Sequence, residues 1–145
     1  MNDASLYDLG PALRLALLGI AIAGYLTWVH YAHLEPVCVG GGGGCERVQS
    51  SRWAELAGIP VAVLGLGGYV AILASLALPE EPGALVATFL TLVGFGFSAW
   101  LTYVEIEKIE AICQWCVASA AVMTALALAS VARVLRAAPP AARAA

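Results

Sequence analysis

The sequence predicts an all-α membrane protein: a bundle of four transmembrane helices with an extracytoplasmic loop that carries a short interfacial helix. Two observations lead to this fold class. Hydrophobic residues make up 61% of the 145 residues and charged residues only 12%, which is more apolar surface than a soluble domain of this size can bury. Moreover, four stretches contain no Asp, Glu, Lys or Arg, namely residues 15–34, 56–79, 82–104 and 111–132.

These four stretches predict four membrane-spanning helices. Each is about as long as the ~20 residues that a spanning helix needs. None alternates apolar and polar residues, so helices are favoured over strands. We therefore expect one domain over residues 1–145, with helices at about residues 12–34, 59–79, 83–104 and 111–133. The Ala-, Pro- and Arg-rich tail at about residues 137–145 is expected to be disordered.

The basic residues give a weak indication of orientation. Four spans put both chain ends on one side, and cytoplasmic segments carry an excess of Lys and Arg. The terminal side has Arg14, Arg133, Arg136 and Arg143, against Arg47, Arg52 and Lys108 on the other side. This bias favours cytoplasmic termini and cysteines on the extracytoplasmic face, where disulfides form. An Ala-rich composition that prefers Arg to Lys suggests a bacterial inner membrane, and the single lysine argues against nucleic-acid binding.

The loop at residues 35–58 contains five consecutive glycines between Cys38 and Cys45. Such a run has no side chains with which to pack. We therefore expect both cysteines to be mobile relative to the helices.

A short interfacial helix is predicted at residues 49–58, after the glycine run. Ser50 or Ser51 can cap its start, and Gly58 can end it. Pro60 is then expected to begin the second spanning helix, where its missing N–H costs nothing.

The segment CQWC, residues 113 to 116, opens the fourth predicted helix. Side chains at positions i and i+3 share one helical face, and the helix amino terminus favours a thiolate. Cys116 is about 4.5 Å deeper than Cys113 at 1.5 Å per residue, where a lipid-soluble oxidant such as a quinone can approach it. The motif therefore indicates a redox-active pair that links thiols at the water side with a carrier in the membrane.

A mobile pair and a fixed pair of cysteines on one face indicate a relay. Thiol–disulfide exchange passes through mixed disulfides, so Cys38 and Cys45 can serve Cys113 and Cys116. The relay would visit the 38–45 and 113–116 disulfides and a transient 45–113 bridge. Two other interpretations stay open, namely two structural disulfides or a zinc site formed by all four thiolates.

Other features have simpler interpretations. We interpret His30 and His33 as polar residues at the membrane interface, and the four tryptophans as an aromatic belt. The segment EIEKIE, residues 105 to 110, is interpreted as a solvated turn. Five glycines are interpreted as close-packing points between helices, namely Gly65, Gly67, Gly68, Gly94 and Gly96.

Three segments, SSRWAEL, GIPVAVLGLGGY and CQWCVASA, together with the cysteine pair of the first loop, resemble the vitamin K epoxide reductase family. The resemblance is closest to bacterial members and extends from the first to the fourth predicted helix. Bacterial members often carry a fused thioredoxin-like domain at the carboxyl end. Because this sequence ends at RAA, the resemblance implies a separate partner.

The resemblance implies a membrane thiol:quinone oxidoreductase that supports disulfide bond formation. Cys116 would react with the quinone and pair with Cys113. Cys45 would attack the Cys113–Cys116 disulfide, and Cys38 would exchange with an extracytoplasmic thioredoxin-like (DsbA-like) protein. The co-substrate would be a quinone of the ubiquinone, menaquinone or vitamin K type, with no metal. The alternative is a non-catalytic membrane protein with structural disulfides or a Cys/His metal site.

The expected quinone pocket lies at the mouth of the bundle. Trp53 and Trp115 offer flat apolar walls for a flat ring, and Val61, Tyr69 and Ala120 are further candidates. Animal members of the family have a tyrosine four residues after the second cysteine of the motif, where this sequence has Ala120. The difference implies plain quinone reduction rather than epoxide chemistry.

Overall fold

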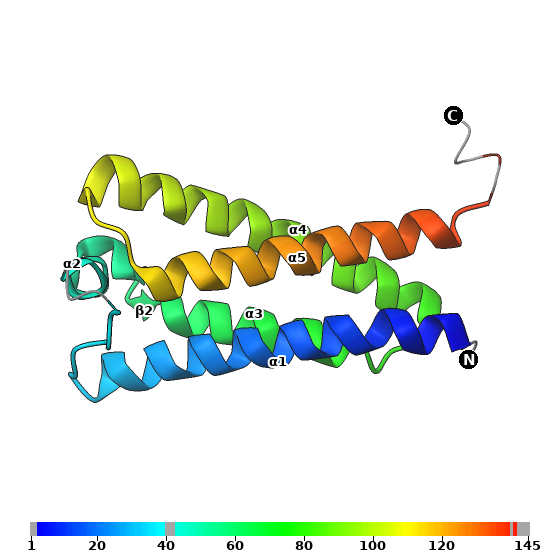
Figure 1. The fold of residues 1–145 in the computed structure, drawn as a ribbon, viewed down its shortest axis with the longest axis horizontal. Coiled ribbons are helices and arrows are strands. Elements are labelled where there is room, and N and C mark those ends of the chain that lie inside the picture. Colours follow the sequence, from blue (N-terminus) through cyan, green and yellow to red (C-terminus); the bar gives the residue numbers. More distant parts are fainter. Residues whose placement is uncertain (1–2, 40–42, 140, 142–145) are drawn as a thin grey trace.

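The computed structural model describes residues 3–39, 43–139 and 141. Four helices lie side by side: α1 (Asp3–Tyr31), α3 (Val61–Ser75), α4 (Glu80–Val104) and α5 (Gln114–Ala137) (Figure 1). Smaller elements gather at one end, here called the cysteine end. They are α2 (Gly44–Ser50), the 3₁₀ turn η1 (Arg52–Ala54), strands β1 (Glu55–Leu56) and β2 (Ile59–Pro60), and the π-helical turn η2 (Glu105–Ile109). The start of α1 and the end of α5 lie together at the opposite, terminal end (Figure 1).

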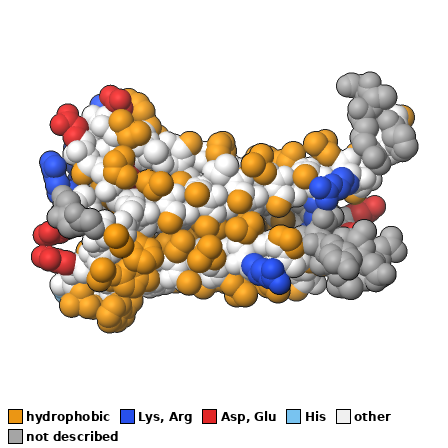
Figure 2. Space-filling view, in the orientation of Figure 1, with side chains coloured by type: hydrophobic (Ala, Val, Ile, Leu, Met, Phe, Trp, Pro, Cys, Tyr) orange, Lys and Arg blue, Asp and Glu red, His pale blue; other side chains and the backbone are white. Residues whose placement is uncertain are grey.

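Three helices are long and apolar enough to cross a membrane, namely Leu9–Tyr31, Glu80–Ile109 and Gln114–Ala137. Helix α3 is also apolar but has only 15 residues, about 22 Å at 1.5 Å per residue, against a hydrocarbon core of about 30 Å. Figure 2 shows acidic side chains at the two ends of the molecule, basic side chains at the left end and over the right half, and an uncharged, largely apolar band between them. The chain is an integral membrane protein with three candidate spans. The 15 residues of α3 do not confirm this helix as a fourth span.

The second expected helix, residues 59–79, is shorter in the structure because both of its ends adopt other conformations. Pro60 belongs to β2 and precedes α3 in extended backbone (φ −57°, ψ 134°). After Ser75, the amides of residues 76–78 donate to carbonyls three residues earlier, which closes the helix with a tight turn. Pro79 then has an extended backbone as the N-cap of α4.

The outer helices also differ from their expected bounds. Helix α1 begins at Asp3 rather than near residue 12, and it continues through Pro11 at the cost of one backbone hydrogen bond. Helix α5 begins at Gln114 rather than at residue 111, because Cys113 is an N-cap with extended backbone (φ −94°, ψ 114°). The CQWC motif therefore crosses the helix start instead of lying inside the helix.

The expected interfacial helix at residues 49–58 is wrong. Helix α2 ends at Ser50, and an antiparallel hairpin follows η1, with Glu55 opposite Pro60 and Leu56 opposite Ile59. Ala57 and Gly58 form its two-residue turn with φ of 55° and 82°, as turns of the primed types require. Gly58 tolerates positive φ in a hairpin turn as well as at a helix end, so its presence alone does not distinguish the two.

The two loop serines do not cap the start of a helix. The Ser51 hydroxyl donates to the Val48 carbonyl at 2.7 Å, and the Ser50 hydroxyl donates to the Arg47 carbonyl at 3.5 Å. Both bonds reach back by three residues and satisfy the end of α2. Serine hydroxyls can bond backbone groups on either side, which explains why the sequence pattern was ambiguous.

Tyr69 of α3 joins three helices in the core. Its side chain is 1% exposed, and its hydroxyl is 2.8 Å from both the carbonyl and the hydroxyl oxygen of Ser119 in α5. Its ring lies so close to Gly19 of α1 that a Cβ atom at that position would overlap the ring. Around it pack Ala16, Ile22, Ala23, Leu26, Ile72, Val122, Met123 and Leu126. Contact of Tyr69 with Gly19 and Ser119 therefore sets the spacing of α1, α3 and α5.

Only one of the five glycines expected at close helix contacts is in such a contact. A Cβ at Gly94 would come within 2.7 Å of the Met123 sulfur, whereas a Cβ at Gly65, Gly67, Gly68 or Gly96 would meet no atom within 4 Å. Gly65 and Gly68 instead leave open space beside α3.

The contact between Gly19 and Tyr69 predicts opposite effects for two alanine substitutions in α1. Gly19→Ala should lower the free energy of unfolding by about 1–3 kcal/mol, because the tyrosine ring must shift. Gly24→Ala is the matched control, since its Cβ meets nothing within 4 Å, and it should stabilise by up to ~1 kcal/mol. Thermal unfolding in detergent measures both; equal melting temperatures would contradict the role of Gly19.

Candidate active site

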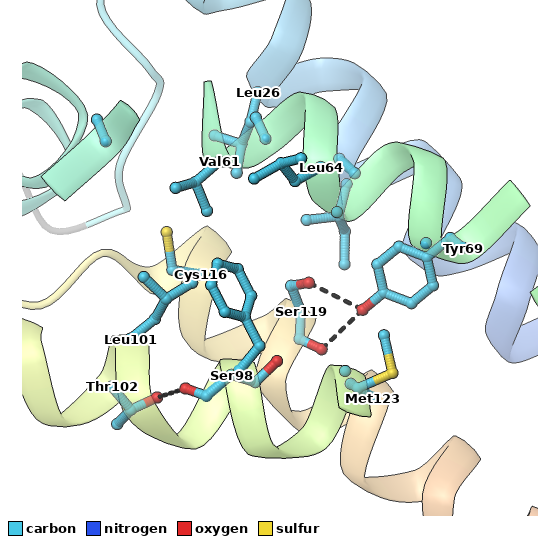
Figure 3. A pocket seen from close by; sticks show the side chains of 18 of the residues that line it. Leu26, Val61, Leu64, Tyr69, Ser98, Leu101, Thr102, Cys116, Ser119 and Met123 are labelled. Atoms are coloured by element: carbon cyan, nitrogen blue, oxygen red, sulfur yellow. Dashed lines mark hydrogen bonds between the residues drawn. The ribbon is translucent and has the colours of Figure 1, made fainter. Parts of the chain in front are cut away.

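A cavity of about 270 Å³ opens among α1, α3, α4 and α5 near the cysteine end. Its walls are mainly apolar, and its volume is close to the lower end of the ~300–1,000 Å³ that is typical of small-molecule sites. Figure 3 shows Val61 and Leu64 of α3 on one side and Cys116, Ser98 and Leu101 on the other. Polar groups meet the cavity at two places, namely Gln49, Glu105 and Cys116 at one, and the hydrogen-bonded Tyr69 and Ser119 at the other.

All four cysteines lie together at the cysteine end. Cys38 and Cys45 form a disulfide, whereas Cys113 and Cys116 carry free thiols. Cys45 (1% exposed) and Cys113 (0% exposed) belong to one buried cluster, and Cys38 and Cys116 pack against it. Cys38 is half-buried and lines an open groove, and Cys116 is half-buried and lines the cavity. The two middle cysteines are therefore sealed, and the two outer ones each face an open space.

Close packing of α2 against the chain before α5 brings Cys45 to Cys113. A Cβ atom at Gly44 would collide with the carbonyl oxygen of Ile112. Only glycine allows this approach, which puts Cys45 beside the start of α5. The expectation that both cysteines lie in an unpacked segment is therefore wrong for Cys45. Residues 40–42 of the glycine run lie outside the described residues.

Glu105 is a functional candidate that the sequence pattern did not reveal, since EIEKIE was interpreted as a solvated turn. Its side chain is 4% exposed, and its Oε2 accepts a hydrogen bond from the Cys113 amide at 3.1 Å. Its backbone carbonyl accepts from the amides of Glu110 and Ala111, so η2 turns back around it. The only available signal was its position as the first charged residue after an uncharged stretch.

Gln49 is a second residue that sequence reasoning missed. Its amide Nε2 donates to the Cys116 sulfur at 3.7 Å, and it lines the cavity beside Glu105. Because α2 was not expected before residue 49, nothing in the sequence linked this amide to the CQWC motif.

Three of the five expected wall residues line the cavity, namely Trp53, Val61 and Tyr69. Trp115 and Ala120 are not among the lining residues. The Trp115 ring packs on Tyr25 with centroids 4.8 Å apart, and its Nε1 donates to the Val37 carbonyl at 2.7 Å. Trp115 thus holds the chain next to Cys38. It does not line the cavity although it is adjacent to Cys116, because successive side chains of a helix project in different directions.

No group of three or more His, Cys, Asp and Glu side chains suited to a metal ion occurs within residues 3–39, 43–139 and 141. The Cys38–Cys45 disulfide also removes two of the four thiolates on which a zinc site would depend. The Nε2 atom of His30 lies 3.3 Å from the Glu55 carboxylate oxygen of β1, a contact that ties the end of α1 to the hairpin.

The Cys113 thiol is primed for nucleophilic chemistry. A hydrogen bond from Cys116 lowers the pKa of Cys113 to about 7, although burial and the neighbouring Glu105 carboxylate act in the opposite direction. The thiolate share of Cys113 at neutral pH is therefore larger than that of an ordinary thiol, and the thiolate is the form that attacks a disulfide.

This pKa predicts how ionisation of the Cys113 thiol depends on pH. The ultraviolet absorbance of the thiolate, which requires no reagent to reach this sealed sulfur, should rise with pH and reach its midpoint near 7. In Cys116→Ala the stabilising hydrogen bond is lost, so the midpoint should move upward, toward the ~8.5 of an unperturbed thiol. A midpoint that is unchanged by the substitution would contradict the role of Cys116.

Comparison with known families agrees with this geometry. Residues 11–131 match the sequence model of the vitamin K epoxide reductase family, a range that includes all four cysteines and the cavity. Members of this family are membrane oxidoreductases that use quinones and generally work with thioredoxin-like partners. The match extends over most of the chain, and so this integral membrane protein belongs to the vitamin K epoxide reductase family.

Proposed function

We propose that the protein is a thiol:quinone oxidoreductase that oxidises a separate thioredoxin-like (DsbA-like) protein and reduces a quinone, and thereby supports disulfide bond formation. The observation that supports this most is the exposure of the cysteines. Cys38 faces an open groove, Cys45 and Cys113 are sealed, and Cys116 faces the cavity. Such an order suits a relay that carries electrons from an outside thiol to a membrane-soluble acceptor.

The inner half of the reaction uses the free thiols of Cys113 and Cys116. Two thiols and one quinone become one disulfide and one quinol, so two electrons and two protons move to the quinone. Cys116 is the thiol that reacts with the quinone, because its residue lines the cavity and Cys113 does not. The Cys113 thiolate then closes the disulfide.

The outer half uses the Cys38–Cys45 disulfide. A partner thiolate attacks Cys38, which shares its open groove with Arg47 and Glu110, and Cys45 leaves as a thiolate. Cys45 then attacks Cys113 of the oxidised inner pair, a step supported by the packing of these two residues in one buried cluster. A second partner thiol resolves the mixed disulfide at Cys38, and the oxidised partner departs. The freed Cys38 then attacks Cys45 of the Cys45–Cys113 bridge, which restores the Cys38–Cys45 disulfide and releases Cys113 as a thiolate.

The cavity provides the quinone site in this proposal. Val61, Tyr69 and Trp53 form apolar walls for a ring of the ubiquinone, menaquinone or vitamin K type. Gln49 beside Cys116 and the Tyr69–Ser119 pair further along α5 provide hydrogen-bonding groups for carbonyl oxygens.

The proposal includes four spans with cytoplasmic termini and the cysteine end outside, in a bacterial inner membrane. Helix α3 runs between the hairpin at the cysteine end and the turn before α4 at the other, which supports a fourth crossing despite its 15 residues. Both described chain ends lie at one end of the bundle, as an even number of crossings requires (Figure 1). An oxidising compartment at the cysteine end suits the Cys38–Cys45 disulfide.

Two cysteine variants separate the halves of the relay. Cys116→Ala should reduce quinone consumption to background with any thiol donor, because no thiol then faces the cavity. Cys38→Ala should retain turnover with a small dithiol, which can attack the inner disulfide at the half-buried Cys116 through the cavity, but lose turnover with a reduced thioredoxin-like donor. Quinone absorbance in detergent measures both. Activity in Cys116→Ala would mean that the quinone meets another thiol, and an inert wild type would favour structural cysteines.

Neighbouring glycines of α3 test the cavity as the quinone site. Gly68 lines the cavity with open space beside it, whereas Gly67 is exposed on the outer side of the helix. Gly68→Leu should fill the cavity and raise the KM for a short-chain quinone about tenfold or more, the equivalent of ~1.4 kcal/mol. Gly67→Leu makes the same change without entering the cavity and should leave KM unaltered. Equal KM values would place the quinone elsewhere.

A further inference from the structure

Glu105 is a buried acid that the relay described above does not use. It directly follows α4, its side chain is 4% exposed, and it has no ion-pair partner within the described part of the chain. A buried carboxylate without a cation is costly, and such groups often occur where protons move. Capping the Cys113 amide requires only an acceptor oxygen, which a neutral amide side chain would supply at lower cost.

The surroundings of Glu105 connect it to both reacting thiols. Its Oε2 is 3.1 Å from the Cys113 amide nitrogen, and it lines the same cavity as Cys116. Helix α2 presents the Gln49 amide to the same place, and the nearby Cys45 is held in its disulfide. Within the described residues, the titratable groups beside Glu105 are therefore Cys113, which precedes α5, and Cys116 in its first turn.

Glu105 also lines the cavity, and among the described lining residues it carries the only carboxyl group. Its neighbours Glu107 and Lys108 on η2 are exposed. One carboxyl group thus bonds the backbone of Cys113 and also faces the proposed quinone site, while Cys113 has no access to bulk water.

From this geometry we propose that Glu105 is a catalytic proton carrier: its carboxylate accepts the protons released when the Cys113–Cys116 pair is oxidised and delivers them to the bound quinone. The delivery step rests on the proposed function.

The step balances over two passes. The Cys116 sulfur adds to a quinone carbon as its proton passes through the Glu105 carboxylate to one quinone oxygen, so an S–H bond breaks and a C–S and an O–H bond form. The Cys113 thiol then gives its proton to Glu105, its thiolate attacks the Cys116 sulfur, and the C–S bond breaks with its electron pair left on the quinone. The second proton passes from Glu105 to the other quinone oxygen. In total two S–H bonds break, one S–S bond and two O–H bonds form, and Glu105 ends as it began.

Three substitutions test this role. Glu105→Gln preserves the size and the acceptor oxygen but cannot carry a proton, Glu105→Asp keeps a carboxyl group on a shorter side chain, and Glu107→Gln is the matched control on the exposed side of the same turn. Each pre-reduced protein in detergent is oxidised in a single turnover, once by a short-chain quinone and once by diamide, a water-soluble oxidant that also takes two electrons and two protons from a dithiol.

We expect Glu105→Gln to slow oxidation by either oxidant about 100-fold or more, as for loss of a general base. Glu105→Asp should be faster than Glu105→Gln, and Glu107→Gln should match the wild type. If Glu105 only caps α5, the order reverses, since Gln is the closer match in size, and the proposal is overturned. The rank order of Asp and Gln decides this even where both variants lose stability.

The two oxidants separate this proposal from the proposed function. A wild type that diamide oxidises but quinone does not would remove quinone reduction as the function, and slower diamide oxidation of Glu105→Gln would still support Glu105 as acceptor of the thiol protons. If Glu105→Gln is slow with quinone but not with diamide, the proposed role of Glu105 as acceptor of the thiol protons is overturned, because Glu105 would then act only on the quinone. If Glu105→Gln reacts at the wild-type rate with both oxidants, the proposal is also overturned.

Discussion

The hydrogen bond from the Cys113 amide to the Glu105 carboxylate is the contact around which the cysteine end is organised. Through its backbone, Glu105 closes the π-helical turn after α4, since its carbonyl accepts from Glu110 and Ala111. Through its side chain, it accepts a hydrogen bond from the Cys113 N–H, which has no partner within the helix that follows. One residue thus ends one long helix and caps the next. Cys113 is thereby held in the wall between them, and Cys116 follows in the first turn of α5 and faces the cavity.

A second constraint is that Cys45 and Cys113 must be shielded from solvent. The close approach of the α2 backbone to the chain before α5 provides this shielding. A thiol relay requires sulfurs that can approach one another while other thiols are kept out. Helix α2 achieves this by resting on the chain before α5, at a distance that only Gly44 permits. Cys45 is thereby buried with Cys113 and Val48. Trp115 contributes from the other side, since its hydrogen bond to Val37 holds the chain that leads to Cys38.

An open cavity inside a membrane bundle needs walls that do not collapse, because unfilled space costs packing energy. Tyr69 supplies such a wall. Its ring rests on Gly19 of α1 and its hydroxyl is bonded to Ser119 of α5, so three helices keep a set spacing. Gly65 and Gly68 on the same helix then leave space rather than fill it. Small residues in this protein therefore serve two opposite purposes, close approach at Gly19 and Gly94 and open volume at Gly65 and Gly68.

The sequence by itself determined the solvent and the chemistry of this protein. Uncharged stretches require burial in a bilayer whatever the fold, and the Cys spacing with CQWC at a helix start indicates redox chemistry through local geometry alone. Only the tertiary structure decided which groups surround the thiols. Glu105 and Gln49 reach Cys113 and Cys116 from other elements, and Trp115 turns away from the cavity although it lies between the two cysteines. The hairpin at residues 55–60 was equally hidden, because Ser51, Gly58 and Pro60 fit a capped helix and a turn with the same local preferences. Distances along the chain fix which residues share a helical face, whereas packing between helices decides what that face meets.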